Sequence, residues 1–245
     1  KIFARADYIQ AISSYLKDFA TRHGARRRTP IEVVPNGVDI EKIKNKKLKI
    51  KNKKNRIFTI ISTSRLVHKN GLDTLMYAAA ELKKHHTPPF IVRIVGDGPE
   101  ARALYSLANK LKVLEEIDFV GGVAPEEIPA YLVEADLFVR PSRSEGLGNS
   151  FLEAMAAGVP IIGTPVGGIP DFLHDPHIFG VTESNGLFTV PNHPVDLAAK
   201  IMLVMKNKFL RAGMGRNGKA LVKKRYSWDK IAQEMGEIFV KITNS

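Results

Sequence analysis

Two acidic residues, Glu145 and Glu153, flank a glycine-rich turn that precedes a predicted helix. Between them, Gly146 and Gly148 carry no Cβ, so a ligand can reach the backbone N–H groups at the start of that helix. A helix N-terminus carries a partial positive charge, which suits a diphosphate. A carboxylate repels phosphate, but its oxygens accept hydrogen bonds from the paired hydroxyls of a sugar or a ribose. These residue types and their spacing indicate a nucleotide-sugar site.

Two cations, Arg65 and Lys69, follow the first strand of a region in which strands and helices alternate. Cations of this kind can neutralise the diphosphate that leaves when a sugar is transferred. The alternative is a pair of solvated charges in front of a helix, and the two residues alone leave that alternative open.

Two further patterns compete with the nucleotide-sugar interpretation. Ser150 and Glu153 have the spacing of a capping box, in which Glu153 folds back onto the Ser150 amide. The run Gly96-Asp-Gly98-Pro-Glu-Ala101 matches the dinucleotide-binding fingerprint. It follows the second strand of the alternating region, and Pro99 occupies the first helical turn, which disfavours a nicotinamide or flavin site. Both patterns stay open as alternatives.

The whole string from Glu145 to Pro160 is more specific than its parts. Gly-x-Gly follows the first acid, and Ala-Met-Ala-Ala-Gly-x-Pro follows the second. The string resembles the signature of the retaining GT-B glycosyltransferases of family 4. That resemblance implies a hexosyltransferase that moves a sugar from a UDP- or GDP-linked donor to a hydroxyl of a glycan, lipid or small molecule. It also implies retention of the anomeric configuration, with no required metal and no other cofactor.

The resemblance assigns roles to residues of this sequence. Arg65, Lys69 and Glu145 would be catalytic, the cations holding the diphosphate and Glu145 orienting the sugar hydroxyls. Glu153 would bind the ribose diol. The family pattern places a lysine five residues after the arginine, where this chain has Asn70, so either Lys69 or Asn70 would take that role. The predicted donor-binding set is Gly98, Gly146, Leu147, Gly148, Asn149 and Glu153.

Apolar strands alternating with amphipathic helices predict the fold class. The expected strands are 57–62, 90–95, 117–120, 136–140, 160–164 and 186–191, with helices at 72–82, 99–112, 125–135 and after the glycine turn. This order predicts an α/β protein with a doubly wound parallel sheet, the Rossmann-like C-terminal half of a GT-B fold. All candidate residues then lie at the carboxyl ends of the strands, where such sheets bind ligands.

The predicted domain organisation has four parts. Residues 1–39 give a strand, a helix capped by Ser13 or Ser14, and a second strand, and they resemble the last βαβ piece of an otherwise missing N-terminal acceptor domain. Residues 40–56 would be a basic interdomain linker, 57–225 the nucleotide-sugar domain, and 226–245 a C-terminal helix, capped by Ser227, that packs back toward the first domain. We expect this chain alone to bind donor weakly and to catalyse nothing.

Composition and charge exclude some classes of function. The net charge of +12 is concentrated between Lys42 and Arg56, where a solvated linker is the favoured interpretation and an anionic-membrane contact the alternative. Without interleaved aromatic residues this segment does not indicate nucleic-acid binding. The chain has no cysteine, which excludes disulfides and thiol catalysis, and its histidines have no recognised metal-binding spacing. No apolar run approaches the roughly 18 residues of a membrane helix. We expect a cytoplasmic protein, with peripheral contact at the inner membrane face left open.

Two other functions remain as alternatives at this stage. The first is a non-catalytic module that binds a nucleotide sugar or regulates another protein. The second is a dinucleotide-dependent Rossmann protein, based on the run from Gly96 to Ala101.

Overall fold

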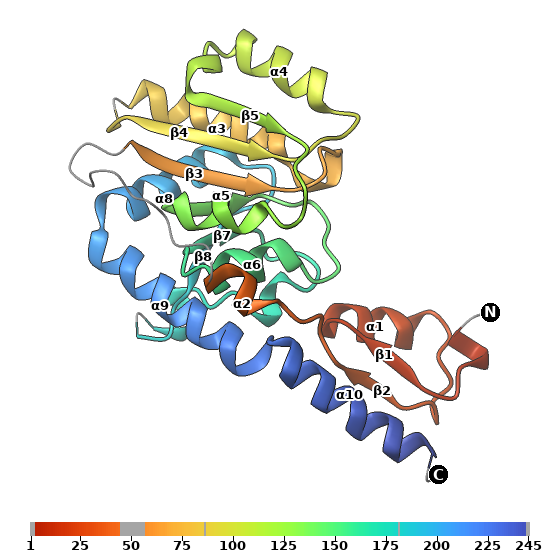
Figure 1. Ribbon diagram of the computed structural model, residues 1–245. Helices are drawn as coiled ribbons and strands as arrows, with labels where there is room; N and C mark the ends of the chain where they lie inside the picture. The colour runs from red at the N-terminus through yellow and green to blue at the C-terminus, as the bar shows by residue number, and fades with distance from the viewer. Residues whose placement is uncertain (1–2, 45–56, 86, 181, 244–245) are drawn as a thin grey trace.

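The computed structural model describes residues 3–44, 57–85, 87–180 and 182–243. These residues form a six-stranded sheet covered by helices and a two-stranded sheet beside it (Figure 1). The strands are β1 (Ile9–Ala11), β2 (Ile31–Val33), β3 (Phe58–Thr63), β4 (Phe90–Val95), β5 (Ile117–Gly121), β6 (Leu137–Arg140), β7 (Ile161–Gly163) and β8 (Gly186–Phe188). The helices are α1 (Ser14–Arg22), α2 (Ile40–Lys44), α3 (Leu72–Lys84), α4 (Ala101–Lys110), α5 (Ile128–Glu134), α6 (Asn149–Ala156), α7 (Pro176–Phe179), α8 (Pro194–Lys206), α9 (Lys208–Arg225) and α10 (Trp228–Thr243).

The larger sheet has the order β5-β4-β3-β6-β7-β8, and every neighbouring pair is parallel. The chain first winds outward from β3 to β5, then returns to the centre at β6 and winds the other way. The strand order therefore reverses between β3 and β6, the topological switch point at which doubly wound sheets bind ligands. The predicted α/β fold with a doubly wound parallel sheet is confirmed.

Successive side chains of the central strands point to opposite faces of the sheet, and each face has its own hydrophobic core. Ile60 packs into a cluster with residues of α3, α4 and α8, while its neighbour Ile61 packs into a second cluster with residues of α5, α6 and α9. Both side chains are fully buried. Successive strand residues point to opposite faces, so apolar residues at both positions require a sheet covered on both sides, which explains why these strands are continuous apolar runs.

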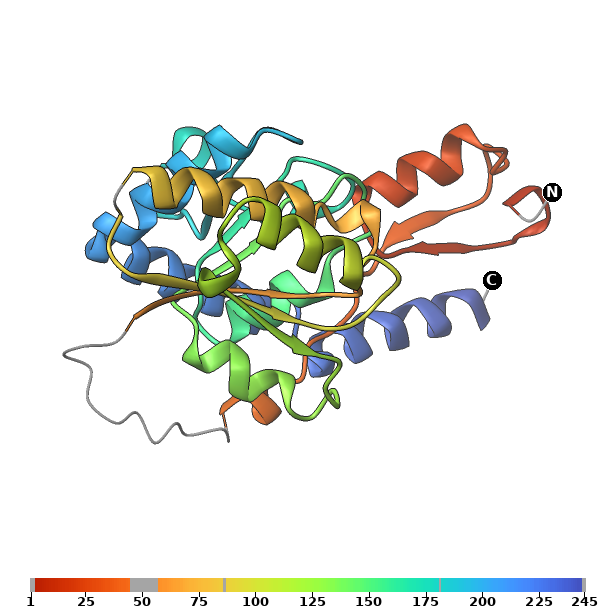
Figure 2. The ribbon, with the colours of Figure 1, turned by 90° about the horizontal axis from the view of Figure 1, so that it is seen from above.

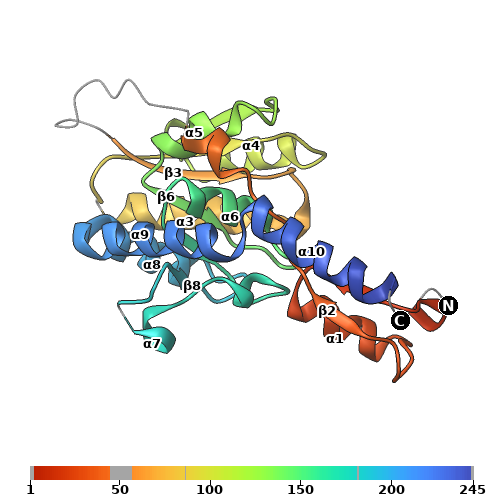
Figure 3. The same ribbon diagram turned by 60° about the horizontal axis from the view of Figure 1, so that its bottom comes forward.

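The smaller sheet and α10 extend together from the end of the larger sheet at which its strands finish (Figures 1 and 2). Ile231 and Ile238 of α10 pack against Val34, next to β2, and Lys241 forms an ion pair of 2.8 Å with Glu32. Figure 3 shows α10 beside β2. The last helix therefore lies against the N-terminal unit. The division of the chain into domains at the predicted residue numbers stays a prediction.

Local sequence signals explain several element boundaries. Ser13 is the N-cap of α1 because its Oγ accepts a hydrogen bond of 3.2 Å from the Leu16 N–H, which settles the choice between Ser13 and Ser14. Ser227 caps α10 in the same way through the Lys230 N–H, at 3.4 Å. Strand β4 has the bounds predicted for it.

The predicted linker begins differently from expectation. Residues Ile40–Lys44 form α2, and Ile43 is buried against the cluster that contains α5 and α6. This short helix belongs by packing to the larger sheet, because a buried isoleucine anchors it there. Residues 45–56, which hold the remainder of the predicted linker and nearly all of its charge, lie outside the described residues.

Candidate active site

A cavity of about 1060 Å³ opens between the carboxyl ends of β3 and β6. It lies at the point where the strand order reverses, as expected for a ligand site in this topology. The cavity brings together cations from the loop after β3 and acids from the loop after β6. Of the predicted site residues, Arg65, Lys69, Glu145, Gly146, Leu147, Gly148, Asn149 and Glu153 line it, and Gly98 does not.

The side chains of Arg65 and Lys69 are exposed and line the cavity. Within the described part of the chain, neither has a hydrogen bond or an ion pair that would occupy its charge. Asn70 is buried, and its side-chain amide donates a hydrogen bond of 2.6 Å to the Arg65 carbonyl. Asn70 therefore stabilises the loop by forming a hydrogen bond with the loop's main chain. The cationic group in this loop that reaches the cavity next to Arg65 is Lys69.

Arg143 fastens the cationic loop to the acidic loop. Its guanidinium donates two hydrogen bonds to the Asp73 carboxylate, at 2.8 and 2.7 Å, and a third of 2.7 Å to the His68 carbonyl. The Arg143 N–H also donates to the Lys69 carbonyl at 2.7 Å. Bidentate arginine–carboxylate pairs fix geometry well, so Arg143 sets the spacing between the two walls of the cavity.

Removing this link should lower the affinity for a nucleotide sugar while leaving the two cations of the loop in place. In Arg143→Ala, the cationic loop loses three side-chain bonds, and we expect nucleotide-sugar affinity to fall about tenfold, because the cations remain present but less ordered. Asp73→Asn should give a similar loss. Isothermal titration of both variants checks this, and unchanged affinity in both would show that the clamp does not order the site.

The glycine turn positions the start of α6. Gly148 is the N-cap, with φ 101°, and a Cβ at that position would lie 2.9 Å from the Phe151 ring. Glycine is therefore required both by the left-handed backbone and by the packing of Phe151. Leu147 is buried and lines the cavity, and its role in donor binding stays a prediction. Asn149 is exposed, and Asn36 donates a hydrogen bond of 3.3 Å to its side-chain oxygen.

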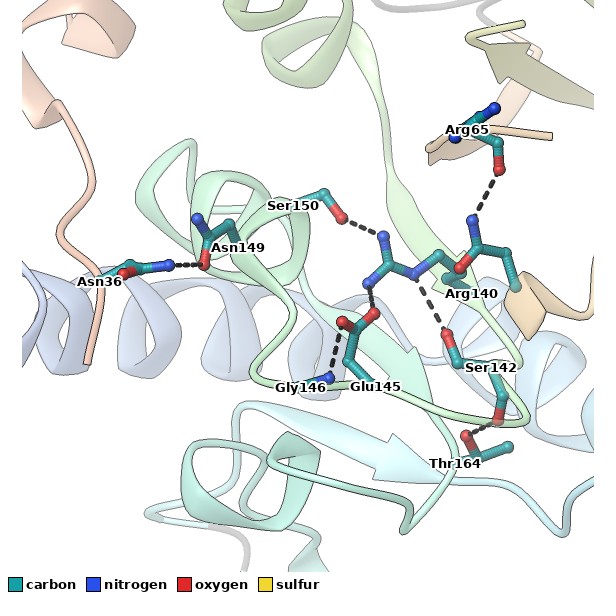
Figure 4. Close-up of polar contacts among 10 residues, drawn as sticks. Asn36, Arg65, Arg140, Ser142, Glu145, Gly146, Asn149, Ser150 and Thr164 are labelled. Atoms are coloured by element: carbon teal, nitrogen blue, oxygen red, sulfur yellow. Dashed lines mark hydrogen bonds and ion pairs between the residues drawn. The ribbon is translucent and has the colours of Figure 1, made fainter. Parts of the chain in front are cut away.

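The carboxylate of Glu145 is held on both sides. One oxygen accepts a hydrogen bond of 3.0 Å from the Gly146 N–H, and the other forms an ion pair with Arg140 (Figure 4). Its side chain is 14% exposed. Each carboxylate oxygen has a second lone pair, so a fixed carboxylate at the edge of the cavity can still accept a hydrogen bond from a ligand hydroxyl.

The Glu153 carboxylate also lines the cavity, and the capping-box alternative for it is wrong. Helix α6 has Gly148 as its N-cap and no side-chain hydrogen bond at the cap. Ser150 instead accepts a hydrogen bond from Arg140. No residue of the described chain forms a hydrogen bond or an ion pair with the Glu153 carboxylate, so its oxygens are free to accept a hydrogen bond from a ligand. Burial raises the pKa of Glu153 above its usual value, while the charge of Arg140 opposes this rise.

The raised pKa of Glu153 predicts a pH-dependent site. If the ionised carboxylate binds a diol, protonation removes an acceptor, so donor affinity should fall as the pH is lowered through this pKa. Because the pKa is raised, the fall should begin at a higher pH than for a solvated glutamate. Titrations between about pH 5 and 8 test this. The Glu153→Gln variant should bind the donor more weakly, and its affinity should lack this pH dependence. A pH profile identical to that of the unsubstituted protein would refute the assignment.

The glycines of the dinucleotide fingerprint have a packing role. A Cβ at Gly96 would lie 2.0 Å from the Ser64 carbonyl oxygen, and one at Gly98 would lie 2.4 Å from that of Leu66. Both glycines therefore let the loop after β4 pack against the loop that carries Arg65. This explains the motif without a bound dinucleotide. Gly98 lies behind the cationic loop, and its role in donor binding stays a prediction.

Sequence reasoning missed Arg140, whose buried guanidinium lines the same cavity. The signal was available, because a charged residue at the end of the apolar run Leu137-Phe-Val is out of pattern for a buried strand. Within the described residues, no group of three or more His, Asp or Glu side chains could hold a metal ion. No helix in that part of the chain is long and apolar enough to cross a membrane.

A doubly wound sheet with unpaired cations, two acids and a helix N-terminus at its switch point has the groups expected of a nucleotide-sugar site. The sequence comparison agrees and is more specific. The profile of the family "Glycosyl transferases group 1" matches residues 41–221, and the chain belongs to this family.

Two relatives with assigned activities are glycosyltransferases. The chain is 30% identical over 244 residues to the GDP-mannose-dependent alpha-(1-6)-phosphatidylinositol monomannoside mannosyltransferase of Mycobacterium tuberculosis, covering 94% of this chain and 61% of that protein. It is 30% identical over 139 residues to the alpha-monoglucosyldiacylglycerol synthase of Streptococcus pneumoniae, covering 53% of this chain and 31% of that protein. The chain thus spans about 60% of the mycobacterial relative.

Solved structures confirm the fold. Sucrose-phosphate synthase from Thermosynechococcus elongatus superposes with a TM-score of 0.84 at 23% identity, covering 99% of this chain and 60% of that one. The Anabaena protein HepE in complex with UDP-glucose gives a TM-score of 0.82 at 22% identity, covering 97% and 65%. Over nearly all of its length the chain therefore has the fold of the corresponding part of these GT-B proteins.

Proposed function

We propose that this chain carries the donor site of a retaining hexosyltransferase that uses a UDP- or GDP-linked sugar. The observation that supports this most directly is the cavity between β3 and β6, where unpaired cations face two acids across a helix N-terminus. The cations and the helix N-terminus match a diphosphate, and the acids match hydroxyls on either side of it.

The proposed roles follow from where charge develops. During transfer, the bond between the anomeric carbon and the diphosphate oxygen breaks, and its electron pair leaves with the diphosphate. The acceptor hydroxyl oxygen bonds to the anomeric carbon and gives its proton to the departing diphosphate oxygen. Arg65, Lys69 and the α6 N-terminus meet the charge on the leaving group, the kind of stabilisation that lowers such barriers most. Glu145 orients the sugar, and Glu153 binds the ribose.

A binding panel tests the donor assignment. We expect the complete protein to bind UDP or GDP more tightly than ADP, and the corresponding nucleotide sugar at the same site. Incubation with that donor and an acceptor should release the free nucleoside diphosphate. NMR of the product then reports the anomeric configuration, and inversion would refute the retaining mechanism.

A second candidate, a non-catalytic nucleotide-sugar-binding module, makes a different prediction for the same panel. It predicts donor binding without release of nucleoside diphosphate for any acceptor. The names of the two relatives suggest which acceptors to assay, since one relative acts on a phosphatidylinositol mannoside and the other makes a glucosyldiacylglycerol. We therefore propose lipid-linked acceptors as the first to be assayed. Sedimentation with anionic vesicles tests the accompanying peripheral membrane contact.

A further inference from the structure

Arg140 is a buried cation in a strand that is otherwise apolar. It ends β6, and its side chain is 7% exposed. A buried charge is costly unless it is paired and hydrogen-bonded. Arg140 satisfies this condition on every nitrogen of its guanidinium. Nε donates to the Ser142 Oγ at 3.2 Å, one terminal nitrogen donates to the Ser150 Oγ at 2.6 Å, and the other pairs with the Glu145 carboxylate (Figure 4).

The partners of Arg140 lie in three places around the proposed donor site. Ser142 lies in the turn that follows β6, Glu145 is the proposed sugar-orienting acid, and Ser150 lies in the first turn of α6. The guanidinium carbon also lies 4.7 Å from the centre of the Phe151 ring, in the same helical turn. One side chain thus connects the end of the strand, the acid and the phosphate-facing helix.

We propose that Arg140 is a positioning residue of the donor site, whose guanidinium fixes the Glu145 carboxylate relative to the first turn of α6. This inference rests on the proposed function and adds to it a residue outside the predicted set. A sugar held by Glu145 and a diphosphate held at α6 belong to one ligand, so the distance between their two protein contacts must be fixed. Arg140 is bonded to the Glu145 carboxylate and to the Ser150 hydroxyl in the first turn of α6, and it thereby fixes that distance.

Arginine suits this role better than lysine. The guanidinium is planar and donates in three fixed directions, whereas an ammonium group is a point charge on a flexible stem. In Arg140→Lys the charge would remain near Glu145, but a single nitrogen cannot reach both serines and the carboxylate with the same geometry. The lysine variant should therefore restore part of what Arg140→Met loses.

The charge of Arg140 also acts on the second acid. Glu153 lines the same cavity, and Arg140 favours its ionised form against the effect of burial. The other charged or titratable groups that line the cavity are Glu145, Arg65, Lys69 and His68, and all of them remain in an Arg140 variant. Replacing Arg140 by methionine should therefore raise the pKa of Glu153 further and shift the acid limb of the donor-binding pH profile upward.

The decisive experiment is a double-mutant cycle in the complete protein. We expect Arg140→Met to lower kcat/KM by on the order of 100-fold, as a displaced contact does in a preorganised site. Affinity for the nucleotide sugar should fall more than affinity for the nucleoside diphosphate, because Glu145 contacts the sugar. If Arg140 acts through Glu145, the double variant Arg140→Met/Glu145→Gln should be little worse than either single variant. Additive losses in the cycle, or equal losses for both ligands, would overturn the proposal.

A matched control separates positioning from general destabilisation. Arg93 lies in β4, pairs with Asp118 at 2.8 Å and Glu134 at 3.2 Å, and packs against the Tyr131 ring, but it does not line the cavity. Arg93→Met should leave donor binding unchanged. If the unsubstituted protein binds no nucleotide sugar, the proposed function fails. If it binds and Arg140→Met binds equally well, the role of Arg140 alone fails.

Discussion

Gly167→Ala is expected to reduce transfer by about 100-fold and to destabilise the protein. Gly167 has φ +57°, and a Cβ there would lie 1.7 Å from the Glu145 carbonyl oxygen and 2.7 Å from its carbonyl carbon. These distances are far below the 3.0 Å that Cβ contacts almost never go under. The atoms in the way are backbone, so no side-chain rotation can relieve the clash. The loop that carries Glu145 must move instead.

The size of the effect can be estimated from two contributions. Alanine in the left-handed region costs about 1–2 kcal/mol, and overpacking of this kind adds roughly 1–3 kcal/mol. The transfer rate should also fall, because a shift of about 1 Å in a catalytic contact can reduce the rate by around 100-fold. The unfolding midpoint and the nucleotide-sugar affinity of the complete protein measure the two parts separately.

Gly158→Ala is the matched control for this variant. Gly158 also has a positive φ, +78°, but the nearest atoms to a Cβ there lie 3.9 Å away, an ordinary van der Waals contact. The Gly158→Ala variant should lose stability only through backbone strain, and it should keep its affinity for the donor. If Gly167→Ala binds the nucleotide sugar as well as Gly158→Ala does, the turn at Gly167 does not hold the Glu145 loop in place.

The sheet and most of the cavity lining could be predicted from the sequence because of how the strands end. Uninterrupted apolar strands followed by glycine, serine or charged residues mark both the strand and its carboxyl end. Because ligands bind at those ends in a doubly wound sheet, residues such as Arg65 and Glu145 could be placed together while being 80 positions apart in the chain. Helix α2 escaped prediction because its five residues are too few to show a helical period.

The chemistry of individual side chains was harder to predict. Glu153 has the same spacing whether it caps a helix or faces a ligand, and only the position of the helix start, with Gly148 as the cap, excludes the capping box. Asn70 occupies a position where a cation was expected, and its bond to the Arg65 carbonyl depends on the fold of the loop. Arg140 has partners in the turn after β6, in the glycine loop and in α6, a combination that no local pattern contains.

Arg65→Ala is the second variant for which we expect a large effect. In the proposed mechanism, Arg65 meets the charge that develops on the leaving diphosphate. Loss of one such preorganised donor typically costs about 100- to 1000-fold in rate. Both a higher donor KM and a lower kcat are expected, because the diphosphate is present in the ground state and gains charge in the transition state. Steady-state kinetics of the complete protein measure both constants.

This variant should be easy to interpret because Arg65 is exposed and its side chain has no bonding partner within the described residues. Removing it leaves no buried group unpaired, so the free energy of unfolding should change by less than about 0.5 kcal/mol. Arg102→Ala is a suitable control, since Arg102 is also exposed but lies on α4 and does not line the cavity. The control should keep the kinetics of the unsubstituted protein.

Ligand truncation assigns the contact of Arg65 to the diphosphate. If Arg65 binds the diphosphate, Arg65→Ala should weaken binding of the nucleoside diphosphate and leave binding of the bare nucleoside unchanged. Arg65→Lys should recover part of the affinity, because the charge returns without the planar geometry. Lys69→Ala should show the same selectivity with a smaller loss, since a flexible ammonium is a less directional contact. Equal weakening for nucleoside and nucleoside diphosphate would place Arg65 at another part of the ligand, and unchanged kinetics would remove it from the site.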